Sequence, residues 1–136
     1  MIREEICTYE VCKLAKEKGF PQDECGVNIG YYAWDGCRNI HSLVSSFAWY
    51  NDEYNHDDLY LAPTQALLQR WLREEKGVIV EVFVDDDSNM PLTYNIHQYK
   101  DFNWECVCQH HGNYYAINDW ELCLEDALKY ALENLV

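Results

Sequence analysis

Basic residues are scarce in this sequence, in which ten lysines and arginines stand against 24 aspartates and glutamates. The formal charge of −14 repels the phosphate backbone of nucleic acids, so the sequence does not predict direct binding of RNA or DNA. An acidic surface favours solubility and basic partners instead. We therefore expect any macromolecular partner to be another protein.

Long hydrophobic runs are also missing from the sequence. No apolar stretch approaches the roughly 18 residues that are needed to span a bilayer. The opening residues, MIREEICTYE, are polar and acidic, unlike the apolar centre of a secretory leader. These absences predict a cytoplasmic protein that makes no contact with a membrane.

A regular cysteine pattern is missing as well. The cysteines form an odd set at irregular spacings, which does not fit a disulfide framework. In the cytoplasm such thiols stay reduced. The seven residues are Cys7, Cys12, Cys25, Cys37, Cys106, Cys108 and Cys123.

Aromatic residues, in contrast, are abundant, with eleven tyrosines and five tryptophans. Disordered chains lack such side chains, because without them too little apolar surface is buried to offset the loss of chain entropy. A chain of 136 residues is also long enough for one hydrophobic core. We expect a single folded domain over residues 1–136.

Apolar periodicity predicts three helices, over residues 8–18, 63–76 and 120–134. Their apolar positions recur at three- and four-residue spacings, as in a helix with one buried face. Residues that favour a helix boundary flank these segments. These are Thr8 and Gly19, Pro63 as the first helical residue, Gly77, and Asp119.

Strand patterns fill most of the remaining sequence. VIVEVFV (78–84) is apolar on both faces and is expected at the centre of a sheet, and LTYNIHQY (92–99) alternates. WECVCQH (104–110) and NYYAIN (113–118) are predicted as a hairpin with a tight turn near Gly112-Asn113. The predicted fold class is α+β, with an antiparallel sheet of about four to six strands and two or three helices packed on one face.

The first half of the chain has weaker signals. Asp35-Gly36 is a typical hairpin turn, and LVSSFAWY (43–50) alternates loosely enough to be a strand. The following NDEYNHDD (51–58) is an acidic loop without the ligand spacing of a calcium-binding loop. We expect it to be solvated.

Three stretches together resemble a known group of proteins: VCKLAKEKGF, APTQALLQRWLREEKGVIVEVF and EDALKYALENLV. They are similar to segments of small uncharacterised proteins from Bacteroides-type gut bacteria and their prophages. In that group a helix of the form PTQ-LL-RWLRE precedes an apolar strand, and a helix of the form E-AL---L ends the chain. The resemblance implies an accessory protein of bacterial or phage origin, and it carries over no catalytic or binding residue.

The second half also shares its order of elements, helix, strands, helix, with double-stranded-RNA-binding domains. Such domains present basic residues at the start of the last helix to reach phosphates. Here that helix begins with DWELCLED, which has the opposite charge. Nucleic-acid binding is therefore not predicted from the order of elements either.

The stretch WECVCQHH (104–111) is the densest group of potential metal ligands. Side chains two apart on a strand lie about 6.6 Å from each other. Two thiolates on one zinc ion must lie roughly 3.8 Å apart, so Cys106 and Cys108 do not suit a zinc site. Hairpin parity places both on the apolar face with Trp104, Tyr115 and Ile117. We expect both cysteines to pack in the core.

Other cysteine and histidine residues leave a small Cys/His enzyme or ligand-binding protein open as an alternative. Cys25 and Cys37 lie in the irregular first half with His41 and His56. Cys123 lies in the first turn of a helix, but the neighbouring glutamates oppose a thiolate. No residue is predicted as catalytic, cofactor-binding or metal-ligating, and no cofactor is expected.

The leading hypothesis is a non-enzymatic, acidic accessory protein of a phage or mobile element that acts by protein–protein contact. Tyrosine and tryptophan are favoured at protein interfaces, and they are frequent between residues 31 and 60. A structural component of a phage assembly is a further alternative, and the chain is expected to be a monomer or homodimer. The predicted interaction surface comprises Tyr31, Tyr32, Trp34, Trp49, Tyr50, Tyr54 and His110.

Overall fold

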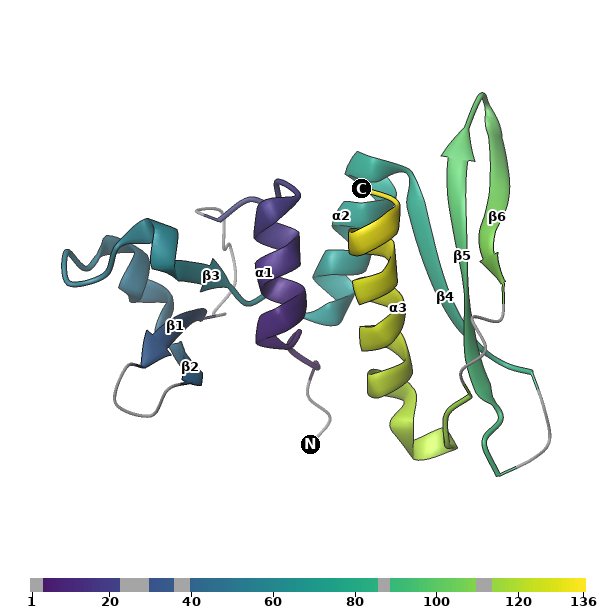
Figure 1. Cartoon of the computed structure of the whole chain (residues 1–136), viewed down its shortest axis with the longest axis horizontal. Helices are drawn as coiled ribbons and strands as arrows, with labels where there is room; N and C mark the ends of the chain where they lie inside the picture. The colour runs from purple at the N-terminus through teal and green to yellow at the C-terminus, as the bar shows by residue number, and fades with distance from the viewer. Residues whose placement is uncertain (1–3, 23–29, 36–39, 86–88, 110–113) are drawn as a thin grey trace. The chain divides into compact units, whose positions relative to one another are not determined.

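The computed structural model describes residues 4–22, 30–35, 40–85, 89–109 and 114–136 (Figure 1). Three α-helices and six strands occur in these residues, so the α+β class is confirmed. Contacts divide the chain into two compact units, Met1–Thr64 and Gln65–Val136. In the described residues the strands form two three-stranded antiparallel sheets, one in each unit, and not the single larger sheet that was predicted.

Unit 1 contains a β2-β1-β3 sheet in which both strand pairs are antiparallel. Its α-helix contacts the short strand β3. Two 3-10 helices, η1 and η2, lie between β2 and β3 in the sequence. The elements are α1 (Tyr9–Glu17), β1 (Tyr31–Asp35), β2 (Ile40–Val44), η1 (Ser46–Tyr50), η2 (His56–Asp58) and β3 (Leu59–Leu61).

The first helix begins and ends close to where the sequence predicts. The side chain of Thr8 caps α1 by accepting a hydrogen bond from the Val11 amide at 3.5 Å. At the other end Gly19 has a φ of +97°, which a residue with a side chain rarely adopts. The amides of Gly19 and Phe20 donate to the carbonyls of Lys16 and Ala15 at 3.1 and 2.9 Å. These two bonds form a Schellman motif, in which Gly19 ends the helix.

The hairpin in unit 1 is confirmed, because β1 pairs with β2 from Tyr31↔Val44 to Asp35↔Ile40. Its connection, residues 36–39, lies outside the described residues. Of the predicted strand over 43–50, Leu43 and Val44 lie in β2 and the rest is wrong. Ser45 caps the 3-10 helix η1 by accepting a hydrogen bond from the Phe47 amide at 3.2 Å. A serine that bonds to the backbone in this way favours a helical turn over an extended chain.

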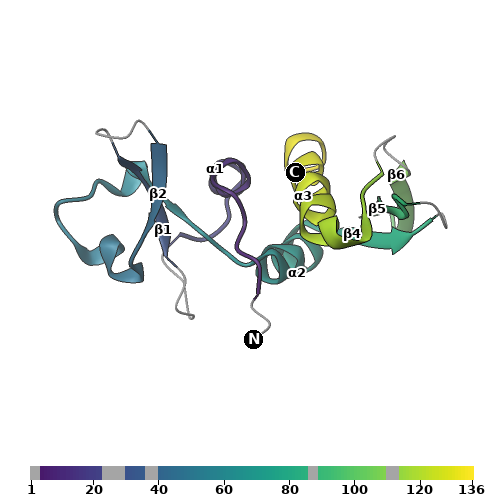
Figure 2. The same ribbon diagram turned by 90° about the horizontal axis from the view of Figure 1, so that it is seen from below.

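Unit 2 has two helices on one face of the β4-β5-β6 sheet, as Figures 1 and 2 show. Its core is mainly aliphatic and also contains the ring of Tyr94: Leu68, Leu72, Val78, Leu92, Tyr94, Ile96, Leu128 and Leu132 are fully buried. The elements are α2 (Gln65–Lys76), β4 (Val78–Val84), β5 (Leu92–Lys100), β6 (Asn103–Gln109), η3 (Ile117–Asp119) and α3 (Trp120–Asn134).

Two details of unit 2 differ from expectation. Helix α2 begins at Gln65, so Pro63 precedes the helix and does not open it. The Pro63 carbonyl instead accepts a hydrogen bond from the Cys7 amide at 2.9 Å. Within the described residues β4 pairs with β5 alone, so it lies at an edge of the sheet and not at its centre. Helices α2 and α3 both contact β4, which explains in part why this strand is apolar.

The partner of β6 is β5 and not NYYAIN. Asp101 and Phe102 connect the two strands, with φ values of +52° and +65°. Two positive φ values in a two-residue loop define a type I′ turn, which normally carries asparagine, aspartate or glycine. In NYYAIN, Tyr115 forms a single bridge to Leu92, and a 3-10 helix follows at Ile117. The turn predicted near Gly112-Asn113 lies outside the described residues.

A β-bulge separates the two cysteines of β6. Ile96 pairs with Cys108, whereas the next residue of β5, His97, pairs with Cys106, so Val107 is the extra residue. The extra residue shifts the alternation of faces by one. Cys108 is buried as predicted, but Cys106 lies on the exposed face of the sheet. The prediction that both cysteines pack in the core is wrong for Cys106.

Trp104 also departs from the predicted parity, because it pairs with Tyr99 and is 49% exposed. It therefore does not share the core face with Cys108. In the part of the chain that the structure describes, no helix is long and apolar enough to cross a membrane.

Candidate functional site

A first group of aromatic rings in unit 1 lies around Trp49. The Trp49 ring lies parallel to that of His56, with centroids 3.6 Å apart, and on Tyr31 at 5.6 Å. The His56 Nε2 atom also lies 2.5 Å from the Trp49 carbonyl oxygen. Tyr31 is fully buried. These contacts join β1, η1 and η2, so Trp49 and Tyr31 serve the internal packing of unit 1.

A second group of rings lies around α1. The rings of Tyr9 and His41 stack at 3.7 Å, and Trp34 lies 4.9 Å from His41. Tyr60 and Tyr32 meet the ring of Tyr9 edge-on. The Tyr32 hydroxyl donates a hydrogen bond to the Cys7 carbonyl at 2.9 Å. His41 is thus held by aromatic neighbours, and the described residues place no cysteine thiol in hydrogen-bond contact with it.

Lys16 fixes the acidic loop to α1. Its ammonium donates to the backbone carbonyls of His56, Asp57 and Leu59, at 2.8, 3.2 and 2.7 Å. It also lies over the Tyr60 ring at 4.7 Å. Desolvation lowers the pKa of Lys16, and the charges of Asp57 and Asp58 oppose this effect. A single cation therefore holds η2 and the start of β3 in place.

Helix η1 turns two aromatic rings outward. A 3-10 helix has three residues per turn, so Phe47 and Tyr50 lie on the same face. They are 76% and 77% exposed, whereas Ala48 between them is 5% exposed. The fold thus divides the aromatic residues of η1 into an inward ring, Trp49, and two outward rings.

Two open hollows of about 630 and 440 Å³ lie beside the outward rings. Tyr50, Asn51, Asp52 and Tyr54 line both of them. The side chain of Asn51 accepts a hydrogen bond from the Glu53 amide at 3.0 Å, which fixes the turn that carries the two acids. We refer to Phe47, Tyr50, Asp52, Glu53 and Tyr54 as the aromatic-acidic surface.

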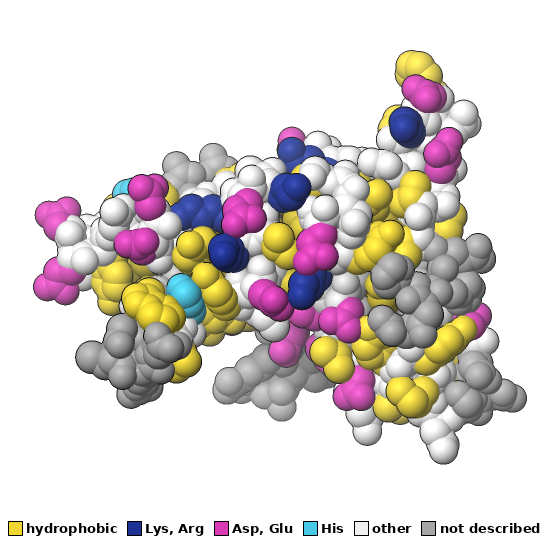
Figure 3. All heavy atoms as spheres, in the orientation of Figure 1, with side chains coloured by type: hydrophobic (Ala, Val, Ile, Leu, Met, Phe, Trp, Pro, Cys, Tyr) yellow, Lys and Arg dark blue, Asp and Glu magenta, His cyan; other side chains and the backbone are white. Residues whose placement is uncertain are grey.

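The structure redistributes the residues that were predicted as an interaction surface. Trp34 and Tyr50 are exposed, and Tyr54 is half-buried at the hollows. Tyr31, Tyr32 and Trp49 serve internal contacts, and His110 lies outside the described residues. Phe47 was missed, although Ser45 and the three-residue spacing of Phe47 and Tyr50 are a signal for an exposed 3-10 turn. Figure 3 shows acidic and hydrophobic side chains next to each other over unit 1.

The buried thiols of unit 2 are poor nucleophiles. Burial, with a smaller contribution from Asp126, raises the pKa of Cys123 to about 11. Burial also raises the pKa of Cys108. Because the thiolate is the reactive form, neither cysteine is activated near neutral pH. The described residues contain no group of three histidine, cysteine or acidic side chains arranged to hold a metal ion.

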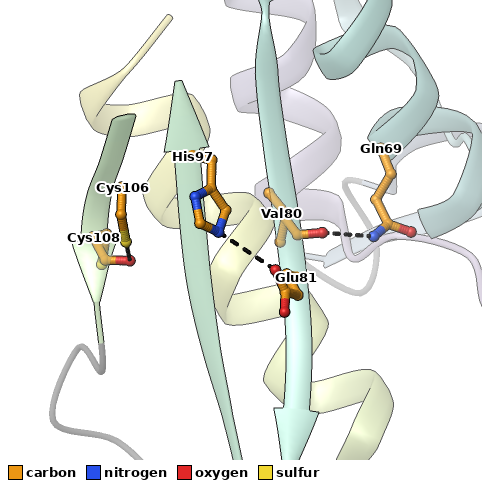
Figure 4. A network of polar contacts seen from close by, with 6 residues as sticks. All are labelled: Gln69, Val80, Glu81, His97, Cys106 and Cys108. Carbon is orange, nitrogen blue, oxygen red and sulfur yellow. Dashed lines mark hydrogen bonds and ion pairs between the residues drawn. The ribbon is translucent and has the colours of Figure 1, made fainter. Parts of the chain in front are cut away.

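One row of polar residues lies on the exposed face of the unit 2 sheet (Figure 4). The His97 ring of β5 lies next to the Glu81 carboxylate of β4, with 3.4 Å between Nε2 and Oε2. Cys106 of β6 pairs with His97 across the strands, although its sulfur donates to the Cys108 carbonyl at 3.7 Å. The sequence could not reveal this row, because the bulge at Val107 creates it.

No protein-family model, curated protein or solved structure matches this chain. The functional interpretation therefore depends on the chemistry of the two surfaces described above.

Proposed function

We propose that this chain is a non-enzymatic binding protein whose aromatic-acidic surface recognises a basic protein partner. The observation that carries the proposal is the outward pair Phe47 and Tyr50, each more than three-quarters exposed beside Asp52 and Glu53. Aromatic side chains are favoured as anchors of protein interfaces, where they fill pockets of the partner. Adjacent carboxylates select a partner with lysine or arginine at the rim of its pocket.

The segment that presents these rings is ordered before any partner arrives. Lys16 holds η2, His56 stacks on Trp49, and Asn51 fixes the turn between the two 3-10 helices. A preorganised segment loses little conformational entropy on binding, which increases the affinity for a given contact area. Because unit 1 has only short strands, many of its aromatic rings take part in internal contacts that fix this segment.

The cellular context remains a proposal that depends on the resemblance. A cytoplasmic accessory protein of a phage or mobile element would bind a host or phage protein through this surface. A structural role in a phage assembly is the competing proposal, and it predicts stable homo-oligomers larger than a dimer. Sedimentation of the purified chain separates the two, since the proposed function needs only a monomer or homodimer.

Comparison of matched variants tests the binding surface. The double variant F47A/Y50A removes both outward rings, and I117A removes a 58% exposed residue of unit 2 as a control. We expect a basic protein from bacterial cytosol to bind the parent chain and I117A, and to lose at least about tenfold in affinity for F47A/Y50A. Binding should also weaken as salt is added. Equal binding by F47A/Y50A would rule out this surface.

A second candidate function, thiol chemistry at Cys106, is favoured by the row Cys106, His97, Glu81. An exposed thiol beside a histidine that is itself oriented by a carboxylate has the order of groups found in cysteine nucleophiles. The thiol would transfer its proton to His97, and the resulting thiolate would attack an electrophilic carbon and displace a leaving group, which departs with the electron pair of the broken bond. In the present geometry the sulfur bonds to a carbonyl, so His97 would have to take over that hydrogen bond.

Alkylation with iodoacetamide tests this second function. If it holds, Cys106 reacts faster than a free cysteine at pH 7, and both H97A and E81Q slow the reaction about tenfold. If Cys106 reacts at the rate of a free cysteine in the parent chain, H97A and E81Q alike, the thiol is not activated and this second function is ruled out. A zinc assay on the purified chain addresses the metal-binding form of the same alternative.

A further inference from the structure

The two edges of the unit 2 sheet differ in whether another element lies against them. At the β4 edge, helix α2 lies alongside, and the Gln69 side chain donates a hydrogen bond to the Val80 carbonyl at 3.4 Å (Figure 4). Val80 faces that edge, because the bonds Tyr99–Gly77 and Asp85–Pro91 direct the odd-numbered residues of β4 toward β5. A side chain from the helix thus occupies an acceptor of this edge.

The β6 edge has no such cover within the described residues. Lys100 and Asn103 close the two-residue turn, so Asn103 and Glu105 direct their backbone groups toward β5. By the same alternation Trp104 and Cys106 direct their amides and carbonyls away from the sheet. The side chains of residues 103–106 are all exposed. An uncovered row of backbone donors and acceptors is a template for a further strand.

Three aromatic rings accompany this edge. Trp104 and Tyr99 are each about half exposed, and their ring centroids lie 5.2 Å apart. Phe102 at the turn is 91% exposed and has a φ of +65°. A bulky residue in this backbone region is strained, and such strain is found most often at functional sites. The turn lies beyond the ends of α2 and α3 in Figure 1, so these helices leave it accessible.

We propose that the β6 edge binds an extended, basic segment of a protein as an added strand. Backbone bonds to Trp104 and Cys106 would supply affinity, as in other strand-addition complexes. A lysine or arginine of the segment would lie over the Trp104 and Tyr99 rings, and the exposed Asp101 of the turn would complement the charge of the segment. This site is separate from the aromatic-acidic surface and does not depend on the function proposed for it.

Charge and the bulge argue for this occupant over a second copy of the chain. Each copy carries −14, so two identical edges repel each other, whereas a basic segment is attracted. The bulge at Val107 interrupts the regular ladder, which leaves residues 103–106 as the straight part of the edge. An edge of this length suits a short peptide better than the pairing of two long strands.

Binding of designed peptides to the full chain tests the proposal. The probe is a fluorescent hexapeptide that alternates lysine and valine, and its counterpart replaces lysine with glutamate. In C106P the outward amide of β6 is removed at a position where an edge strand tolerates proline. In C106A the thiol is removed and the amide is kept. Circular dichroism and amide exchange in α3 establish that both variants are folded.

We expect the basic peptide to bind the parent chain and C106A equally, and to slow amide exchange at Trp104 and Cys106. C106P should weaken binding by about tenfold, which corresponds to the loss of one backbone hydrogen bond. W104A should weaken binding as well, through loss of the stacked cation. F47A/Y50A should leave it unchanged, which separates this site from the aromatic-acidic surface.

Four results would overturn the proposal. They are no binding of the basic peptide at millimolar concentration, equal binding of the acidic peptide, undiminished binding by folded C106P, and a homodimer whose amide protection maps to β6. The last result would mean that a second copy occupies the edge.

Discussion

The two units of this chain are stabilised by different side chains. In unit 2, leucine, isoleucine and valine of two helices and a sheet fill a continuous core. In unit 1, stacked rings and a lysine that binds three carbonyls hold short strands and 3-10 turns together around a small core that includes Val11, Leu59 and Leu61. Aliphatic packing is non-directional, whereas ring stacks and hydrogen bonds fix particular residues at particular angles. The comparison indicates that the contacts of unit 1 hold the segment between β2 and β3 in a defined conformation.

The largest effect is expected for L128A in α3. Leu128 is fully buried, so its truncation should lower the free energy of unfolding by about 3 kcal/mol. L122A, at a position 54% exposed in the same helix, should change it by less than about 0.5 kcal/mol. Urea unfolding measures both.

Amide exchange in L128A also tests the expected single domain. If unit 1 loses protection together with unit 2, the chain unfolds as one cooperative domain. If only unit 2 loses protection, the two units are separate folding units. If L128A lowered the free energy of unfolding by less than about 1 kcal/mol, Leu128 would not be part of a tightly packed core.

The next largest effect is expected for W49A, which removes the ring between Tyr31 and His56. Because Trp49 is only partly buried, we expect a loss of about 2 kcal/mol and faster amide exchange over residues 46–58. Y50A, one residue along, should leave stability and exchange unchanged, since Tyr50 is exposed. Similar behaviour of the two variants would remove the distinction between inward and outward rings.

A smaller effect, about 1–2 kcal/mol, is expected for K16M, which keeps the aliphatic stem and removes the donor to three carbonyls. Limited proteolysis near His56 should become faster. K13M, at an exposed position of the same helix, is the matched control. Unchanged proteolysis in K16M would show that ring stacking alone holds η2.

The smallest effect concerns alkaline pH and Cys123 of unit 2. Its pKa is raised to about 11 in the folded chain, so the unfolded chain releases this proton first as pH rises. The resulting stabilisation is complete below about pH 9 and is lost between about pH 9 and 11. C123A should remove about 1 kcal/mol of the alkaline loss by pH 9.5, measured by urea unfolding against pH. An unchanged pH profile would contradict the burial of this thiol.

Much of unit 2 was predictable, because its signals are local. Helix periodicity and apolar strands gave α2, α3, β4 and β5 to within a few residues. The pairing of β6 was not predictable, since its type I′ turn carries Asp101-Phe102 in place of the usual glycine. The bulge at Val107 has no sequence signature, and it changed which face carries Cys106.

The structure of unit 1 was less predictable from the sequence, for a physical reason. Its stabilising contacts join residues distant in sequence, such as Tyr9 with His41 and Lys16 with Leu59. No periodicity encodes such pairs. The predicted interaction surface and the aromatic-acidic surface lie in the same segment, but which of Trp49 and Tyr50 points outward was apparent only from the structure.

The bulge in β6 has a consequence for how this strand tolerates insertions and deletions. Removal of Val107 alone would make Cys106 and Cys108 neighbours in a regular strand, still paired with His97 and Ile96 and therefore still on opposite faces. A regular strand that kept all of its residues would instead place both cysteines on one face. The strand can therefore lose its extra residue without moving a thiol between the core and the surface.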